Sequence, residues 1–311
     1  GTDTWSSLMA SIGRGADELQ TEGGLADRML GEWVREHLLP KPATPTPSTP
    51  PPLVTVGTAL LATVGAASGR PAARFLLREQ FVHKGLLLVL QEESLLASRD
   101  PSASGAADPP YLGDPPPQPA ADGALLCAVL NRPTSASVAF NLPGRPTRRL
   151  PICGNLPLPR SLSKDAQGQL WLHHRAELGG TALGSAGLFM LPTVAVAALL
   201  KEEKATAADF LIVGGVVRFE RAELAGMLAA GEMRALPPGE QLTALWPRVW
   251  ALTDDDGSKS PPSDGTEVWW LASQCGAEQG QLVAPPPAGI ADEALEEWLS
   301  WFARDPPTVQ P

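Results

Sequence analysis

Residues 125–135 read LLCAVLNRPTS. The apolar run that ends at Leu130 is typical of a buried strand, yet Asn131, Arg132 and Pro133 follow it directly. Asparagine favours turn geometry and proline cannot donate to a strand ladder, so the pattern predicts a turn that ends a strand. Arg132 would then pair with a carboxylate or a carbonyl of the core. A second interpretation, in which Asn131 and Arg132 stand at a rim and contact a ligand or a partner, stays open.

The segments on either side of this stretch predict a core of strands and helices. Apolar runs that are bounded by turn residues indicate strands at residues 53–63, 81–93, 123–130, 169–174 and 209–219. Helical spacing indicates helices at residues 192–201, 220–231 and 239–252. Gly231 is expected to cap the second of these helices, and Pro247 to kink or divide the third. Residues 266–273, TEVWWLAS, fit either a strand or a helical turn.

Proline-rich segments predict where the chain divides into a core domain, linkers and terminal helices. We expect a core domain at residues 53–252, interrupted by a disordered insertion of small residues and prolines at 97–122. Amphipathic helices are expected at both termini, because apolar residues recur there at helical spacing. The remaining boundaries are N-terminal helices at 1–39, a linker at 40–52, a linker and extension at 253–289, and a C-terminal helix at 290–311.

Charge and hydropathy exclude two classes of protein. The formal net charge is −10, which disfavours binding to nucleic acid because phosphates would be repelled. The one short basic cluster, Arg145, Arg148 and Arg149, reads as a solvated loop. The longest apolar stretch, Ser185–Leu200, is interrupted by Pro192 and is too short to cross a bilayer, so no transmembrane segment is predicted.

Few side chains in this sequence could take part in catalysis or metal binding. The three cysteines form neither a CxxC pair nor a zinc-ligand spacing, so we predict no metal and no cofactor. No nucleophile elbow, phosphate loop or metalloprotease motif is present, and no enzymatic activity is predicted. His173 and His174 are adjacent on a strand and should point to opposite faces, which disfavours a shared metal. His173 remains a candidate contact for a ligand or a partner.

Several stretches together resemble the AlgH/YqgE-like family, which comprises bacterial and plastid proteins without an assigned reaction. The match covers roughly residues 53–252 and rests on the order of its motifs: GTALLAT (57–63), FVHKGLLLVLQEE (81–93), CAVLNRPTS (127–135), PICGNLPLP (151–159), LWLHH (170–174) and LIVGGVVRFERAELAGMLAAGEMRAL (211–236). The chain departs from the family at Asn155 and Leu156, where the family has Gly and Pro. It also has Gln91-Glu92-Glu93 in place of Glu-His.

The resemblance implies a fold and a compartment. The expected fold is an α+β domain with a mostly antiparallel, barrel-like sheet flanked by helices. The appended segments look like additions of an algal or plant plastid lineage, which implies the chloroplast, in the stroma or on the stromal side of a membrane complex. Because the chain begins at Gly1, we expect that a transit peptide has been removed.

Aromatic residues in the terminal helices suggest what the protein does. Tryptophan on an amphipathic helix often anchors a protein interface, although such helices also fold back on their own core. We therefore expect a non-enzymatic scaffolding subunit of a multi-subunit complex, such as the protein-import translocon of the inner envelope. Alternatives are a regulatory domain that binds a small anion near Arg132, or an uncharacterised hydrolase. The candidate partner-binding residues are Trp5, Trp33, Trp298, Trp301 and Phe302.

Overall fold

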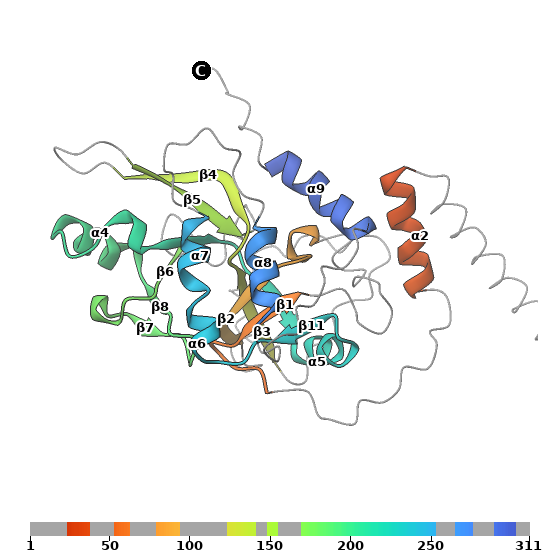
Figure 1. Ribbon diagram of the computed structural model, residues 1–311, viewed down its shortest axis with the longest axis horizontal. Helices are drawn as coiled ribbons and strands as arrows, with labels where there is room; N and C mark the ends of the chain where they lie inside the picture. Colours follow the sequence, from red (N-terminus) through yellow and green to blue (C-terminus); the bar gives the residue numbers. More distant parts are fainter. Residues whose placement is uncertain are drawn as a thin grey trace, which may run out of the picture.

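Two sheets and the helices around them build the protein (Figure 1). The computed structural model describes residues 24–37, 53–62, 79–93, 123–140, 148–154, 169–252, 265–275 and 289–302. The predicted α+β class is confirmed: helices accompany sheets that are antiparallel except for one strand pair, and one sheet is curled into a half-barrel. The predicted insertion at 97–122 and the linker at 40–52 lie outside the described residues.

The first sheet has five strands in the order β10-β3-β2-β1-β11, and every neighbouring pair is antiparallel. Its strands are β1 (Ala59–Ala62), β2 (Leu86–Glu93), β3 (Ala124–Val129), β10 (Val217–Glu220) and β11 (Met233–Ala235). The second sheet has six strands in the order β4-β5-β9-β6-β8-β7, with only β5 and β9 parallel. Its strands are β4 (Pro133–Phe140), β5 (Arg148–Gly154), β6 (Gln169–His173), β7 (Thr181–Ala182), β8 (Phe189–Leu191) and β9 (Leu211–Gly214).

Strand β3 is buried on both of its faces. Alternate side chains point in opposite directions along a strand, so Leu125 and Cys127 enter one apolar cluster with Phe219, whereas Ala128 enters another with Trp246. A strand that is covered on both sides has no polar face to show, which is why its sequence reads as a continuous apolar run. The chain then leaves the first sheet at Asn131 and Arg132 and enters β4 of the second.

Three predicted strands differ from the observed ones. Residues 209–219 are not one strand, because Gly215 adopts a left-handed φ of +78° and divides the run into β9 and β10, which lie in different sheets. The strand expected at 53–63 is confined to β1, with a turn before it at Gly57. The strand expected at 81–93 starts only at Leu86, because a 3₁₀ turn (η1, Gln80–Val82) and a left-handed Lys84 precede it.

The helices cover the sheets and bring large aromatic residues to the core. They are α4 (Thr193–Lys201), α5 (Arg221–Ala230), α6 (Glu240–Thr243), α7 (Trp246–Ala251) and α8 (Thr266–Ser273). Gly231 caps α5 in the left-handed conformation, and the 239–252 segment is divided into α6 and α7, with Pro247 in the first turn of α7, as predicted. TEVWWLAS is a helix, and its Trp269 is buried among the side chains that surround Trp246.

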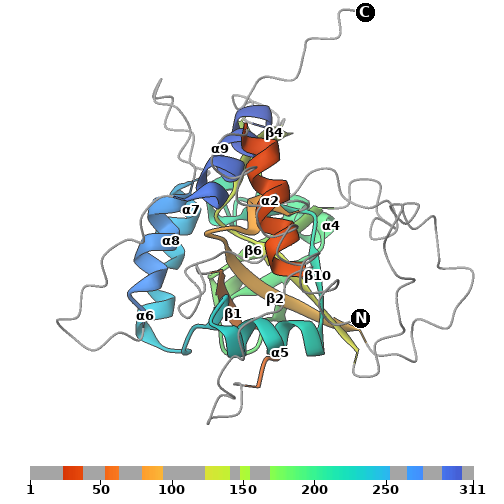
Figure 2. The same cartoon turned by 90° about the vertical axis from the view of Figure 1, so that its right-hand side faces the viewer.

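The two terminal helices, α2 (Leu25–His37) and α9 (Ile290–Phe302), pack beside each other (Figure 2). The Arg28 guanidinium on α2 donates to the Glu293 carboxylate on α9 over 3.0 Å. Helix α9 also contacts η1, and the rings of Trp298 and Phe81 lie 5.5 Å apart between centroids. The C-terminal helix therefore packs on the core of the same chain, with the side chain of Trp298 as one contact. This packing was one of the two alternatives that the sequence left open.

Candidate functional site

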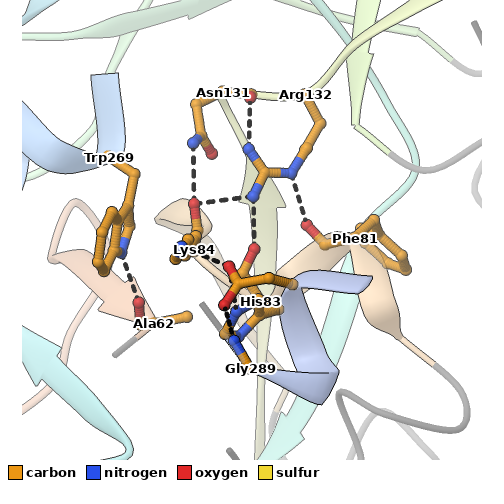
Figure 3. Close-up of polar contacts among 9 residues, drawn as sticks. Ala62, Phe81, His83, Lys84, Asn131, Arg132, Trp269 and Gly289 are labelled. Carbon is orange, nitrogen blue, oxygen red and sulfur yellow. Dashed lines mark hydrogen bonds and ion pairs between the residues drawn. The ribbon is translucent and has the colours of Figure 1, made fainter. Parts of the chain in front are cut away.

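Asn131 follows the end of β3, and its side chain binds backbone groups of three residues, of which Figure 3 shows the Lys84 carbonyl. Its amide oxygen accepts a hydrogen bond from Leu86 N over 2.7 Å. Its amide nitrogen donates to the Lys84 carbonyl over 3.0 Å and to the Gly265 carbonyl over 2.8 Å. One side chain thus holds the start of β2, the turn that precedes it and the start of α8.

The Arg132 guanidinium is directed at the same turn (Figure 3). Nε donates to the Phe81 carbonyl over 3.1 Å, and Nη1 donates to the Asn131 carbonyl over 3.0 Å. Nη2 donates to the Lys84 carbonyl over 2.9 Å and also to the carbonyl of His83. The side chain has no exposed surface. Its fork of donors is therefore engaged by backbone carbonyls, which was one of the partners that the sequence predicted for a turn.

We call Asn131, Arg132 and the carbonyls that they bind the carbonyl clamp. Several carbonyls can converge on one guanidinium because Lys84 has a φ of +51°, a conformation that is costly for a residue with a Cβ and persists only where its surroundings enforce it. Gly265 closes the clamp from the side of α8. A Cβ at Gly265 would lie 1.7 Å from the Asn131 carbonyl oxygen, so this position requires glycine.

A carboxylate from the C-terminal helix lies against the clamped turn. Asp292 Oδ1 forms an ion pair with Lys84 Nζ and lies 3.3 Å from His83 Nε2, while Oδ2 accepts from Gly289 N over 2.9 Å. Lys84 Nζ also lies 5.4 Å from the centre of the Trp269 ring, within the range of a cation–π contact. Asp292 therefore joins the clamped turn to the first turn of α9.

The protonation states in this cluster follow from burial and contact. Burial alone would raise the pKa of Asp292, but hydrogen bonds from His83, Lys84 and Gly289 outweigh it and hold the pKa well below its usual range. Burial lowers the pKa of His83 by more than its contact with Asp292 raises it. At neutral pH the cluster thus contains an ionised Asp292 and a neutral His83.

His173 lies in a different cluster. It ends β6 and is fully buried, with its ring stacked on Phe189 at 5.4 Å and edge-on to Phe210 at 6.0 Å. Neither ring nitrogen makes a hydrogen bond of good geometry with a described residue, although the backbone of Gly179 and of Arg175 lies close enough to raise the pKa of the ring somewhat. Burial lowers the pKa of His173, so the ring is neutral at pH 7.

The remaining candidate residues are distributed over the terminal helices. Trp298 packs on Phe81, as described above. Trp33, Trp301 and Phe302 belong to α2 and α9, but their side chains, like the whole of Trp5, lie outside the described residues. The structure thus brings Asn131 and Arg132 together, and places His173 and Trp298 in separate surroundings.

Sequence reasoning missed three members of the clamp region: Lys84, Gly265 and Asp292. The Lys84-Gly85 pair inside an apolar run was a turn signal that was available. No local pattern could have pointed to Asp292, because it lies 209 positions from the histidine that it meets.

The Cys153 thiol, a potential nucleophile, is fully buried. Burial raises the pKa of the Cys153 thiol to about 12, so this cysteine stays protonated and unreactive. Among the described ranges, no group of three or more His, Cys, Asp or Glu side chains is placed to hold a metal ion. None of the helices in those ranges has both the length and the apolar character that a membrane span requires.

Comparisons of the chain with protein-family models, with curated proteins and with solved structures found no match. The resemblance to the AlgH/YqgE-like family therefore stays a prediction from the sequence motifs.

The clamp predicts a large effect of a conservative substitution. Arg132→Lys keeps the positive charge but cannot reproduce the fork of donors, which leaves buried carbonyls unsatisfied. We expect the free energy of unfolding to fall by about 3 kcal/mol. Urea denaturation, followed by tryptophan fluorescence, measures this free energy.

The matched control is Arg218→Lys, since Arg218 is half exposed on β10 and its loss should change stability by less than about 0.5 kcal/mol. Equal effects of the two substitutions would contradict the clamp.

The buried His173 predicts a loss of stability in acid. Its pKa is lowered in the folded state, so the unfolded chain binds more protons as the pH falls below the ordinary value of 6.5, and unfolding is favoured there. His83 adds to the same trend. The free energy of unfolding should therefore decrease from pH 7.5 to pH 5.5, and His173→Phe should reduce that decrease. Denaturation curves at the two pH values test this, and an unchanged pH dependence in His173→Phe would refute it.

Proposed function

We propose that the protein is a non-enzymatic subunit that assembles with other proteins, and that helix α4 is one of its contact surfaces. The observation that carries this proposal is the composition of α4, TVAVAALLK, in which every residue between the terminal threonine and the terminal lysine is apolar. A helix that is apolar on all sides belongs in an interior, yet α4 lies at the margin of the molecule (Figure 1).

Among the residues that the structure describes, only one side of α4 is packed against the rest of the chain. Val196 and Leu200 are buried in the cluster that also contains Trp171 and Phe210. On the opposite side Val194 is 80% exposed, and Ala197 and Ala198 are exposed beside it. These three side chains form a small exposed apolar patch, and apolar patches are among the surface features that mark protein contacts. Val194, Ala197 and Ala198 carry no charge, and the exposed Lys201 follows them on the same face of the helix, so the partner that fits this face presents an apolar surface bordered by an acidic group.

The carbonyl clamp supports a structural role for the residues that looked most chemical in the sequence. An anion site at Arg132 would need an accessible guanidinium, and this guanidinium is buried against carbonyls. A hydrolase that used Asn131 would need its amide to face a substrate, and this amide holds Leu86, Lys84 and Gly265. We therefore favour assembly over both alternatives.

The proposed setting rests on the sequence resemblance alone. Plastid members of the resembled family imply a chloroplast protein, and a multi-subunit complex on the stromal side of the inner envelope, such as the import translocon, is the proposed home. The apolar face of α4 supports the existence of a protein partner. It does not identify that partner, because such a face would fit many large assemblies.

The test is purification of the tagged protein from its own cells, with and without charges on α4. Val194→Glu combined with Ala197→Glu should remove most of the co-purifying proteins, because each carboxylate would have to be desolvated at the contact. Leu53→Glu is the control, since Leu53 is 83% exposed and lies outside α4.

A constant set of partners with the wild-type chain and with Leu53→Glu, but not with the double variant, would support the proposal. Circular dichroism should show that both variants are folded. Elution of the wild-type chain as a lone 32.7 kDa species, or full retention of partners by the double variant, would contradict it.

A further inference from the structure

The hairpin of β4 and β5 is only partly supported by the rest of its sheet. Among the strands that the structure describes, β4 is an edge strand and pairs with β5 alone. Residues 137–140 of β4 pair with residues 148–151 of β5, whereas the next strand, β9, pairs with β5 only at residues 152–154. The outer half of the hairpin is therefore a two-stranded ribbon, which runs along the upper margin of the molecule in Figure 1.

The backbone direction along the free edge follows from one hydrogen bond. Gly154 N donates to the Arg132 carbonyl over 2.8 Å, so the N–H of Gly154 faces β4. Amide directions alternate along a strand, which turns the nitrogen of Pro151 away from β4. Ser137 lies opposite Pro151, so its own N–H and carbonyl point away from β5, and those of Ala139 do the same. The N–H and carbonyl groups of Ser137 and Ala139 thus face outward from β4.

Nothing in the sequence of this edge prevents another strand from pairing with it. Natural edge strands are protected by charged side chains, by proline or by bulges. Residues 134–140 of β4 read TSASVAF, with no charge and no proline, and the irregularity of the β4–β5 register lies before Ser137. Two-stranded ribbons are marginally stable in water, and three or more strands are needed for an independent sheet. Among the described strands, none pairs with the outer half of this hairpin on the far side of β4.

We propose that β4 of a second copy of this chain supplies a strand at this edge, so that two molecules form a continuous sheet β5-β4-β4-β5. Both copies have the same incomplete ribbon, and one two-fold axis completes both at once, as in other symmetric dimers. Charge selects the antiparallel orientation. Phe140, at the outer end of β4, pairs with Arg148, so antiparallel strands place the two arginine ends far apart, whereas parallel strands would bring them together.

The inference goes beyond the proposed function, because it concerns contact between copies and does not involve α4. Sedimentation velocity of the full chain, over about 1–100 µM, gives the mass and the dissociation constant. We expect a species of twice 32.7 kDa.

Ser137→Pro removes an outward N–H while leaving the bonds to β5, and should raise the dissociation constant by about tenfold or more. Ser137→Lys places a charge on the edge without changing the backbone and should act in the same direction.

Ser137→Ala is the matched control, because it keeps the N–H, and it should dimerise like the wild type. Hydrogen exchange adds a local measurement: the amides of Ser137 and Ala139 should be protected in the dimer and exposed on dilution. If Ser137→Pro does not fold, Ser137→Lys decides.

A wild-type chain that stays monomeric throughout this range overturns the proposal. So does a dimer that both variants leave intact, or one in which these two amides exchange freely. Protection of the two amides in the monomer only after a different protein is added would also overturn it and would assign the edge to that protein.

Discussion

The structure depends on a guanidinium that is bound by backbone carbonyls. Arg132 carries a full charge into the interior, where an uncompensated charge would be prohibitive, and the carbonyls of Phe81, His83, Lys84 and Asn131 supply the compensating dipoles. Such compensation works only if the carbonyls converge, and they converge only if the chain turns sharply at Lys84. The side chain and the turn therefore require each other.

This mutual requirement explains how segments that are distant in sequence meet. Asn131 extends the clamp to Gly265 and so fixes the start of α8, whose Trp269 donates to the carbonyl of Ala62 on β1. Asp292 extends it to α9 through Lys84 and His83. Because polar residues at the end of β3 perform this task, they are not free for chemistry. Two surfaces that stay open among the described residues, the outer face of α4 and the edge of β4, are the ones that we propose as contacts with proteins.

The sequence predicted those elements whose signals are local. The apolar run of β3, the cap at Gly231 and the division at Pro247 each depend on neighbouring residues, and each was found. The division of residues 209–219 at Gly215 was missed, because apolar residues on both sides of a glycine have the pattern of one strand. Only the tertiary structure places the two halves in different sheets. The turn at Asn131 and Arg132 was predicted, with a carboxylate or a carbonyl as the partner of Arg132, but the particular carbonyls could not be named, because backbone carbonyls carry no sequence signature. The contact of Asp292 with the clamped turn could not be predicted, because its partners lie far from it in the sequence.

We infer that Asn131 and Arg132 hold the fold together and do not form a ligand site. Hydrogen exchange of the full-length Asn131→Ala variant tests it most directly, since the substitution removes the acceptor of Leu86 N and the donor to Gly265 without adding a charge. We expect faster exchange at Leu86, at Gly85 and at the first turn of α8, while β6 and β9 keep their protection. Unchanged exchange at Leu86 and in α8 would contradict the claim and would return Asn131 to the candidates for a binding site.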